Sequence, residues 1–371
     1  MDFSNMVAAG AGVFLDMSGG TGIYCCATSY RIVHRRRSPM ITDADSEFHS
    51  RDLDDRTWTE TMFLPFVIPE EGIFGNVYVL ARPNLGTATS SILIGQGFCT
   101  QPYEIDFTDT QVHLPCPESF SKFTLGNGLA VQAPTPKEYD FSYENVLGAC
   151  SFDLSFRASH EPFDPGDPEQ NPLLEADRGS SDSRHGDAWE NGHFEVKGHI
   201  VGELELRGKR YRIDCYDGMD HSWGPRTEVG TRSVAWVSVN FGPELSAHLA
   251  VLIDLRDGKV VYERLRFGFI VENGVVHPVL EASIRADHTH LLAMNNHIRI
   301  RDVRGKEFEF FGTAISSHPW YSFNPCHVSY QGVFRYHWGD RVGYGEMADI
   351  YGLDYLAQRM SRHGRSQRSL R

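Results

Sequence analysis

Long apolar runs, basic residues and targeting signals are all scarce in this 371-residue chain. No run reaches the roughly 18 apolar residues that a membrane-spanning helix needs, so we expect no transmembrane segment. Residues 6–15 are apolar, but no Lys or Arg precedes them, whereas a secretory signal carries a basic region there. The 35 Lys and Arg residues stand against 49 Asp and Glu residues, which gives a net charge of −14. An acidic chain repels phosphate backbones, and we therefore expect no nucleic-acid partner.

Motifs for metal clusters and nucleotides are also absent. The seven cysteines contain no CxxC or CxxxC pair and are odd in number, which argues against a zinc ribbon and a disulfide scaffold. We expect reduced thiols in a cytoplasmic protein. Gly343–Glu346 lacks the context of a phosphate loop, and no Gly-x-Ser-x-Gly elbow occurs. We expect a protein without a cofactor.

Helical periodicity is scarce too, and Tyr355–Arg362 is the best short candidate. Short β-like runs dominate instead, several with the period-two alternation of half-buried strands. They include Ile73–Arg82, Arg232–Phe241, Ser246–Leu255 and Lys259–Ile270. Asp257-Gly258 between two of these runs predicts a tight hairpin, because glycine accepts positive φ. A second hairpin is predicted from His297–Arg301 to Lys306–Phe311, and the whole pattern predicts an all-β fold of barrels or sandwiches.

A weak internal sequence repeat predicts two related β domains. His193–Gly198 and His327–Gly332 each consist of a His, four residues and a Gly, and a strand-like stretch follows each. We expect an N-terminal domain at 41–228 and a C-terminal domain at 229–360.

Three segments fall outside this pattern. Residues 1–40 are expected to be a disordered arm, or an over-extended start with Met40 as the initiator, and 361–371 a disordered tail. Residues 159–188, rich in Pro, Gly, Asp and Ser, are either a disordered loop or a lid. A lid would make its apolar contacts through Phe163, Leu173 and Leu174.

The first candidate site is the polar and aromatic cluster at 217–226. Asp220, His221, Trp223 and Arg226 crowd into its second half, and its glycines and proline allow the side chains to point to one place. The alternative is a tight turn between domains, in which Asp and Arg pair with each other. A Ser-His-Asp triad is excluded, because three adjacent residues cannot adopt its geometry.

The second candidate site contains His193 and Glu195, which share one face if they lie on a strand. With Asp220 or His221 nearby, they would form a proton-transfer set. A metal site would need His221 to join them. A lone strand His is more often a hydrogen-bonded core or surface residue, so we expect no metal.

Aromatic residues elsewhere are candidates for ligand binding. Trp58 and Glu60 form either a ligand contact with a proton donor or a packed Trp with an exposed Glu. Tyr344 and Glu346 hold a comparable place in the second half of the chain, where the packed aromatic residue with an exposed acid is favoured. Trp236 is a further aromatic candidate for the binding site.

The run from Asp220 to Arg226 resembles the carotenoid hydratase and AttH-like group, which is related to tocopherol cyclases. Gly202–Leu206, the Trp58-Thr-Glu60 triplet and the tandem β organisation carry the resemblance as well, over about residues 55–355. It implies two lipocalin-like domains with an apolar ligand site. It also implies activities such as adding water to an isoprenoid double bond or cyclising a prenyl or polyene chain. The matching site positions are Asp220, His221, Trp223 and Arg226.

Acid–base chemistry of this kind needs a proton donor stronger than water. A carboxylic acid that an apolar pocket keeps neutral supplies one. We expect Asp220 to be the acid, His221 or His193 the base, and Arg226 and Glu195 the orienting groups. The aromatic faces that would hold a carbocation belong to Trp58, Trp223 or Trp236.

The sequence therefore predicts a cofactor-free hydratase, dehydratase, isomerase or cyclase. Its substrate would be a hydrophobic isoprenoid, steroid, polyene or aromatic molecule. The alternative is a carrier that binds such a molecule without changing it. The oligomeric state is open.

Overall fold

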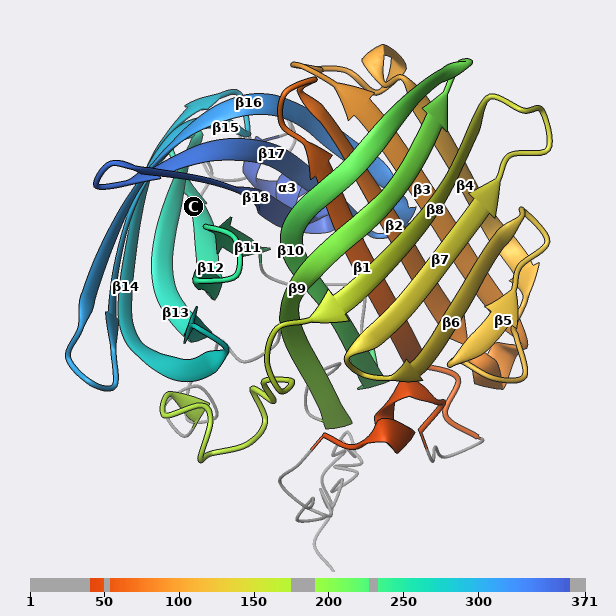
Figure 1. The fold of residues 1–371 in the computed structure, drawn as a ribbon, viewed down its shortest axis with the longest axis horizontal. Helices are drawn as coiled ribbons and strands as arrows, with labels where there is room; N and C mark the ends of the chain where they lie inside the picture. The colour runs from red at the N-terminus through yellow and green to blue at the C-terminus, as the bar shows by residue number, and fades with distance from the viewer. Residues whose placement is uncertain (1–40, 50–53, 175–190, 227–232, 361–371) are drawn as a thin grey trace, which may run out of the picture. The chain divides into compact units, whose positions relative to one another are not determined.

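The strands form two antiparallel sheets in the computed structural model, which describes residues 41–49, 54–174, 191–226 and 233–360 (Figure 1). The predicted arm 1–40 with Met40, and the predicted tail 361–371, lie outside the described residues. No helix within the described residues is long and apolar enough to cross a membrane.

The first sheet has ten strands in the order β4-β3-β2-β1-β10-β9-β8-β7-β6-β5. Its strands are β1 Trp58–Ile68, β2 Ile73–Arg82, β3 Thr87–Gln96, β4 Phe107–Pro115, β5 Lys122–Thr124, β6 Leu129–Thr135, β7 Glu138–Glu144, β8 Cys150–Ala158, β9 Gly192–Leu206 and β10 Lys209–Pro225. Short 3-10 turns lie at Asp43–Ser46, Pro83–Leu85 and Pro102–Glu104.

Burial along these strands follows their place in the sheet. Strand β8, between β7 and β9, alternates between buried and more exposed residues, as a strand with one solvated face does. Strand β1 is buried at nearly every position, and from Met62 to Ile68 its sequence is a continuous apolar run. The sheet curls so that the edge strand β4 approaches β7 near the other edge, since Tyr143 of β7 donates a hydrogen bond to Asp109 of β4 at 2.7 Å. One apolar core fills the curl.

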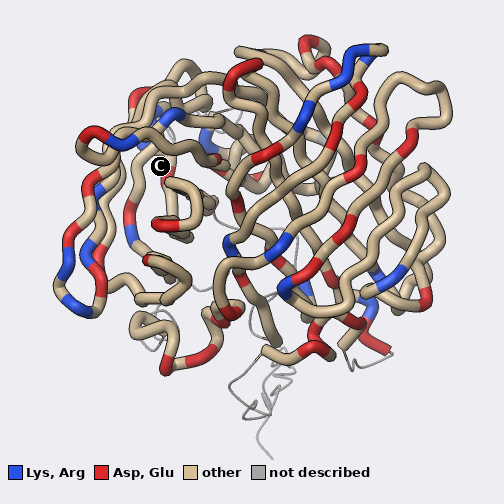
Figure 2. Tube along the Cα trace, viewed as in Figure 1, with Lys and Arg blue, Asp and Glu red and all other residues tan. Residues whose placement is uncertain are grey.

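The second sheet is a closed barrel of β11 to β18 in chain order. Its strands are β11 Ser233–Asn240, β12 Leu245–Arg256, β13 Lys259–Glu272, β14 Val275–Thr289, β15 Leu292–Asp302, β16 Glu307–Asn324, β17 His327–Trp338 and β18 Arg341–Gly352, and α3 Leu353–Met360 follows. Acidic and basic residues are interspersed along the trace of both sheets (Figure 2).

Both predicted hairpins are confirmed. Arg256 pairs with Lys259 across Asp257 and Gly258, whose φ angles of 52° and 76° are the positive values that a two-residue turn needs. The second hairpin joins β15 to β16, as the alternation of Phe and Glu predicted.

The predicted all-β class with two tandem lipocalin-like units is therefore confirmed. The chain passes from the sheet to the barrel between Pro225 and Ser233. The described residues belong to one compact unit, and the division into domains at 228 and 229 stays a prediction.

The predicted loop at 159–188 is packed in its first part. The backbone of Phe163 exchanges two hydrogen bonds with that of Glu195 in β9, at 2.8 and 2.9 Å. The Phe163 ring is fully buried and stacks on Phe269 of β13, with ring centroids 4.7 Å apart. Disorder is thus wrong for residues 159–174, because their apolar side chains are packed. Residues 175–188 lie outside the described residues, and the lid stays a prediction.

Candidate functional site

One cavity lies between a face of the ten-stranded sheet and the outer face of the barrel. Strands β1, β2, β9 and β10 line one side of it, and β11, β12, β16, β17 and β18 line the other. The barrel presents its outer face here, because Trp236 and Ser238 line the cavity while the alternating Val237 and Val239 belong to the barrel core. The empty space is about 1300 Å³, part of it open to solvent. The aromatic walls are Phe63, Tyr78, Trp236, Trp320 and Phe323.

Four of the predicted site residues meet in this cavity. His193 and Glu195 share a face of β9, and His193 Nε2 lies 3.0 Å from Glu195 Oε1. Trp236 reaches across from β11 and donates its Nε1–H to the same oxygen at 2.8 Å. Asp220 of β10 pairs with Glu195 in the strand register, so the two carboxyl groups share one face of the sheet.

Burial controls the protonation of these groups. It raises the pKa of Glu195 to about 8, although Lys197 and the hydrogen bond from Trp236 act in the opposite direction. It also raises the pKa of Asp220 to about 8, and the neighbouring Glu195 carboxyl adds to this rise. Burial lowers the pKa of His193 to about 4. Near neutral pH the cavity therefore holds protonated carboxylic acids beside an unprotonated imidazole.

Arg226 anchors one end of the cavity. Its guanidinium donates hydrogen bonds to Ser222 Oγ at 3.0 Å and to Tyr78 Oη at 3.4 Å. The predicted alternative, in which Asp and Arg of this segment pair with each other, does not occur for Asp220. The Asp220 carboxyl makes no hydrogen bond within the part of the chain that the structure describes, and it lines the cavity.

Sequence reasoning missed a buried ion pair at the cavity wall. Lys197 Nζ donates to Ser238 Oγ at 2.7 Å and lies 3.7 Å from Asp217 Oδ1. All three side chains are buried. A Cβ atom at Gly218 would lie 2.7 Å from this Nζ, so the glycine makes room for the lysine. The i, i+2 spacing of His193, Glu195 and Lys197 would have placed the lysine on the same face of the strand.

His248 of β12 was missed as well. It is 1% exposed, and its Nε2 lies 3.6 Å from Glu195 Oε1. Its ring stacks with Phe267 and Phe269. Burial lowers its pKa well below the ordinary value. A single His within the largely apolar run Ser246–Leu255 was the only signal in the sequence.

The other predicted residues do not line this cavity. His221 follows Asp220 on β10, and successive residues of a strand point to opposite faces. The expectation that His221 would join His193 and Glu195 is therefore corrected. Trp58, Glu60 and Trp223 lie with His221 on the far side of the sheet, where Glu60 pairs with Trp223 in register. Tyr344 is partly exposed, and its carbonyl accepts a hydrogen bond from Asn240.

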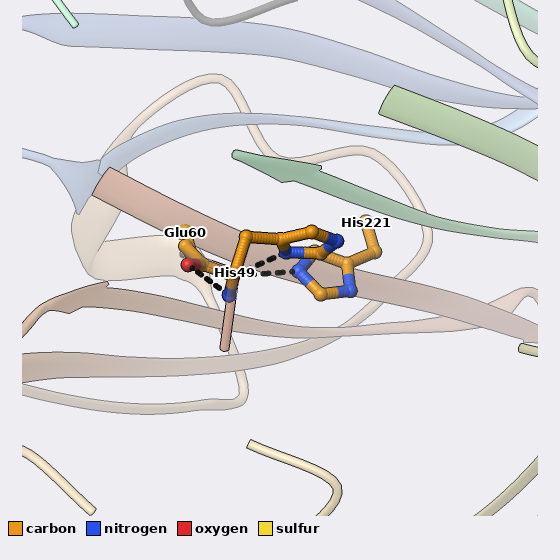
Figure 3. Close-up of side chains that lie close together, drawn as sticks. All are labelled: His49, Glu60 and His221. Carbon is orange, nitrogen blue, oxygen red and sulfur yellow. Dashed lines mark hydrogen bonds and ion pairs between the residues drawn. The ribbon is translucent and has the colours of Figure 1, made fainter. Parts of the chain in front are cut away.

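On that far side, His221 and Glu60 meet His49 (Figure 3). Glu60 Oε2 lies 3.0 Å from His49 Nδ1 and 3.3 Å from His221 Nε2. Burial opposes ionisation of Glu60, but the hydrogen bonds from His221 and His49 outweigh it and lower the pKa to about 2. The alternative prediction, a packed Trp58 with an exposed Glu60, is wrong for Glu60, because this residue is fully buried. Nothing in the sequence marked His49.

A family model described as a domain of unknown function, DUF7064, matches residues 42–349. The chain belongs to the DUF7064 family. No curated protein matches it.

Among solved structures, this DUF7064 chain is similar to an AttH-like protein of Nitrosomonas europaea. The TM-score is 0.52 at 11% identity, over 79% of this chain and 91% of that one. Kievitone hydratase from Nectria haematococca gives a TM-score of 0.49 at 11% identity, over 79% of this chain and 88% of that one. At this identity the likeness concerns the fold alone. The predicted AttH-like fold is confirmed, and the hydratase and cyclase activities stay predictions.

Proposed function

We propose that this DUF7064 protein is an enzyme that adds water to, or removes water from, a hydrophobic small molecule. The same groups would serve an isomerase or a cyclase if water were excluded from the cavity. The observation that carries the proposal is the contact between His193 and Glu195 beside Asp220, inside a cavity with aromatic walls. A neutral acid and a neutral base in one apolar site are the requirements of this chemistry.

In the hydration direction, Asp220 would give its proton to one carbon of a trisubstituted alkene. The tertiary cation that forms at the other carbon would be stabilised by the faces of Trp236 and Trp320. Water attacks the cation and loses a proton to His193, so a C–O and a C–H bond replace the π bond. Glu195 contacts His193 and pairs with Asp220 in the strand register, and it would return the proton to Asp220. Dehydration is the reverse sequence.

A carrier is the second candidate, because the aromatic walls alone can bind an apolar molecule. Enzyme and carrier differ in what they do to a bound ligand. A carrier returns the ligand chemically unchanged.

The test begins with native mass spectrometry of the purified full chain and identification of any molecule extracted from it. That molecule is incubated with the protein in heavy-oxygen water. If nothing is extracted, linalool and myrcene serve as a probe pair of a tertiary alcohol and its alkene. Incorporation or loss of one water supports the enzyme, and binding without conversion supports the carrier.

Asp220→Asn tests the acid. We expect turnover to fall by about 10²–10⁴-fold, while ligand quenching of tryptophan fluorescence persists, because Trp236 and Trp320 line the cavity. Asp214→Asn is the matched control, since this carboxylate lies on the same strand but pairs with His199 at the surface. Full turnover in Asp220→Asn would rule out the acid assignment.

A further inference from the structure

Residues 41–49, called the strap below, are fastened to the first sheet by their acidic residues and by His49. Glu47 accepts hydrogen bonds from the backbone N–H of Phe120, at 2.9 Å, and from the hydroxyl groups of Ser119 and Ser121. His49 donates its backbone N–H to Glu60 Oε1 at 2.9 Å. The strap thus carries an imidazole to the one place where β1 and β10 present Glu60 and His221.

The three side chains form a donor set for a metal ion. His49, Glu60 and His221 each offer one ligand atom, and these three atoms lie within 4.8 Å of one another (Figure 3). Two imidazole nitrogens and one carboxylate oxygen are a set that zinc prefers. The three donors come from segments far apart in the sequence, so they form no short sequence motif that would predict a metal site.

The surroundings fix two of these three donors from outside. Asp45 Oδ1 lies 3.0 Å from His49 Nε2, which is the carboxylate–imidazole support that metal-bound histidines usually have. Trp58 Nε1 donates to Glu60 Oε1 at 3.0 Å, which leaves Oε2 for the two imidazoles. The His49 ring stacks on Trp223 with centroids 3.6 Å apart and planes 5° apart. His221 Nδ1 is buried without a hydrogen-bond partner, so a metal on Nε2 would leave the ring proton on Nδ1.

The charge of the cluster also favours a cation. Glu60 is fully buried, and its contacts in the described part of the chain come from His49, His221 and Trp58. No Lys or Arg of the described residues pairs with it. A buried carboxylate needs a compensating positive charge. A divalent ion among these donors would supply it.

We propose that His49, Glu60 and His221 bind one zinc ion that fastens the strap to the sheet. The site is independent of the proposed enzyme activity, because it lies on the face of the sheet opposite to the cavity. A proton on His49 is the competing occupant, since a doubly protonated ring would donate to both Asp45 and Glu60.

The experiment uses the full chain, stripped with a chelator and titrated with Zn²⁺, and with Co²⁺ as the coloured probe. We expect one equivalent of bound metal and visible Co²⁺ absorption from nitrogen and oxygen ligation. His49→Ala and Glu60→Gln should weaken binding by more than about 100-fold, and Asp45→Asn by about 10–100-fold. The midpoint of thermal unfolding should rise with Zn²⁺ in the wild type but not in His49→Ala.

His199→Ala is the matched control, because this histidine also contacts a carboxylate, Asp214, but lies at the surface. It should bind Zn²⁺ as the wild type does. Wild-type protein that takes up no Co²⁺ or Zn²⁺, or His49→Ala that binds them equally well, would overturn the proposal in favour of a proton on His49. Circular dichroism of each variant separates lost binding from lost folding. Turnover is tested separately by Asp220→Asn, so the zinc site and the enzyme activity can fail independently.

Discussion

Replacing Glu195 by Gln is expected to make the folded protein more stable at neutral pH. The same substitution impairs the proposed active site. Glu195 is 2% exposed, and burial raises its pKa from 4.5 to about 8. The folded protein therefore holds a proton at pH 7 that the unfolded chain has released. The group stabilises the fold fully below about pH 4.5, and this contribution is lost as the pH rises toward about 8. Gln resembles the protonated acid and has no proton to lose.

The size of this gain in stability follows from the shift in the pKa of Glu195. Each pH unit between the unfolded and folded pKa values costs about 1.4 kcal/mol. From the ordinary pKa of 4.5 to pH 7 this amounts to about 3 kcal/mol in favour of Glu195→Gln. The substitution keeps an oxygen that accepts from Trp236 Nε1, so the main hydrogen bond is preserved.

Chemical denaturation at pH 5, 6, 7 and 8 measures this. The difference in the free energy of unfolding between Glu195→Gln and the wild type should grow with pH over this range. Glu203→Gln is the control, because this glutamate lies exposed on the same strand and its substitution should change little at any pH. A difference in the free energy of unfolding that does not change with pH would refute a buried neutral Glu195. So would a difference that favours the variant less at pH 8 than at pH 5.

Three further predictions concern the cavity and the barrel. Turnover should be highest between about pH 4, where His193 loses its proton, and about pH 8, where the acid Asp220 and its neighbour Glu195 lose theirs. Trp236→Phe should move the upper limit to higher pH, because the hydrogen bond from Trp236 lowers the pKa of Glu195; an unmoved pH–rate profile would contradict this. Gly345→Ala should destabilise the barrel by about 1–3 kcal/mol, because its Cβ would lie 2.0 Å from the backbone oxygen of Ser238. Urea denaturation measures this cost, and an unchanged midpoint would speak against it.

Strand alternation made much of the fold predictable. The run Ile73–Arg82 is strand β2 with the predicted bounds, and Asp257-Gly258 forms the predicted turn. Both depend on local rules, namely the period of two and the positive φ that glycine accepts. The same period placed His193 and Glu195 on one face. Applied to Asp220 and His221, it would also have separated them, because adjacent residues of a strand face opposite sides.

The sequence by itself thus determined the strands, the turns and which neighbours along one strand share a face. Only the tertiary structure decided which faces meet. Trp236 reaches Glu195 because the barrel packs its outer face on β9, and no local pattern encodes that contact. His49 reaches Glu60 and His221 because the strap crosses to β1 and β10. Such contacts join residues far apart in the chain, and they form because burial of apolar surface fixes the packing of whole sheets, which then brings the polar groups together.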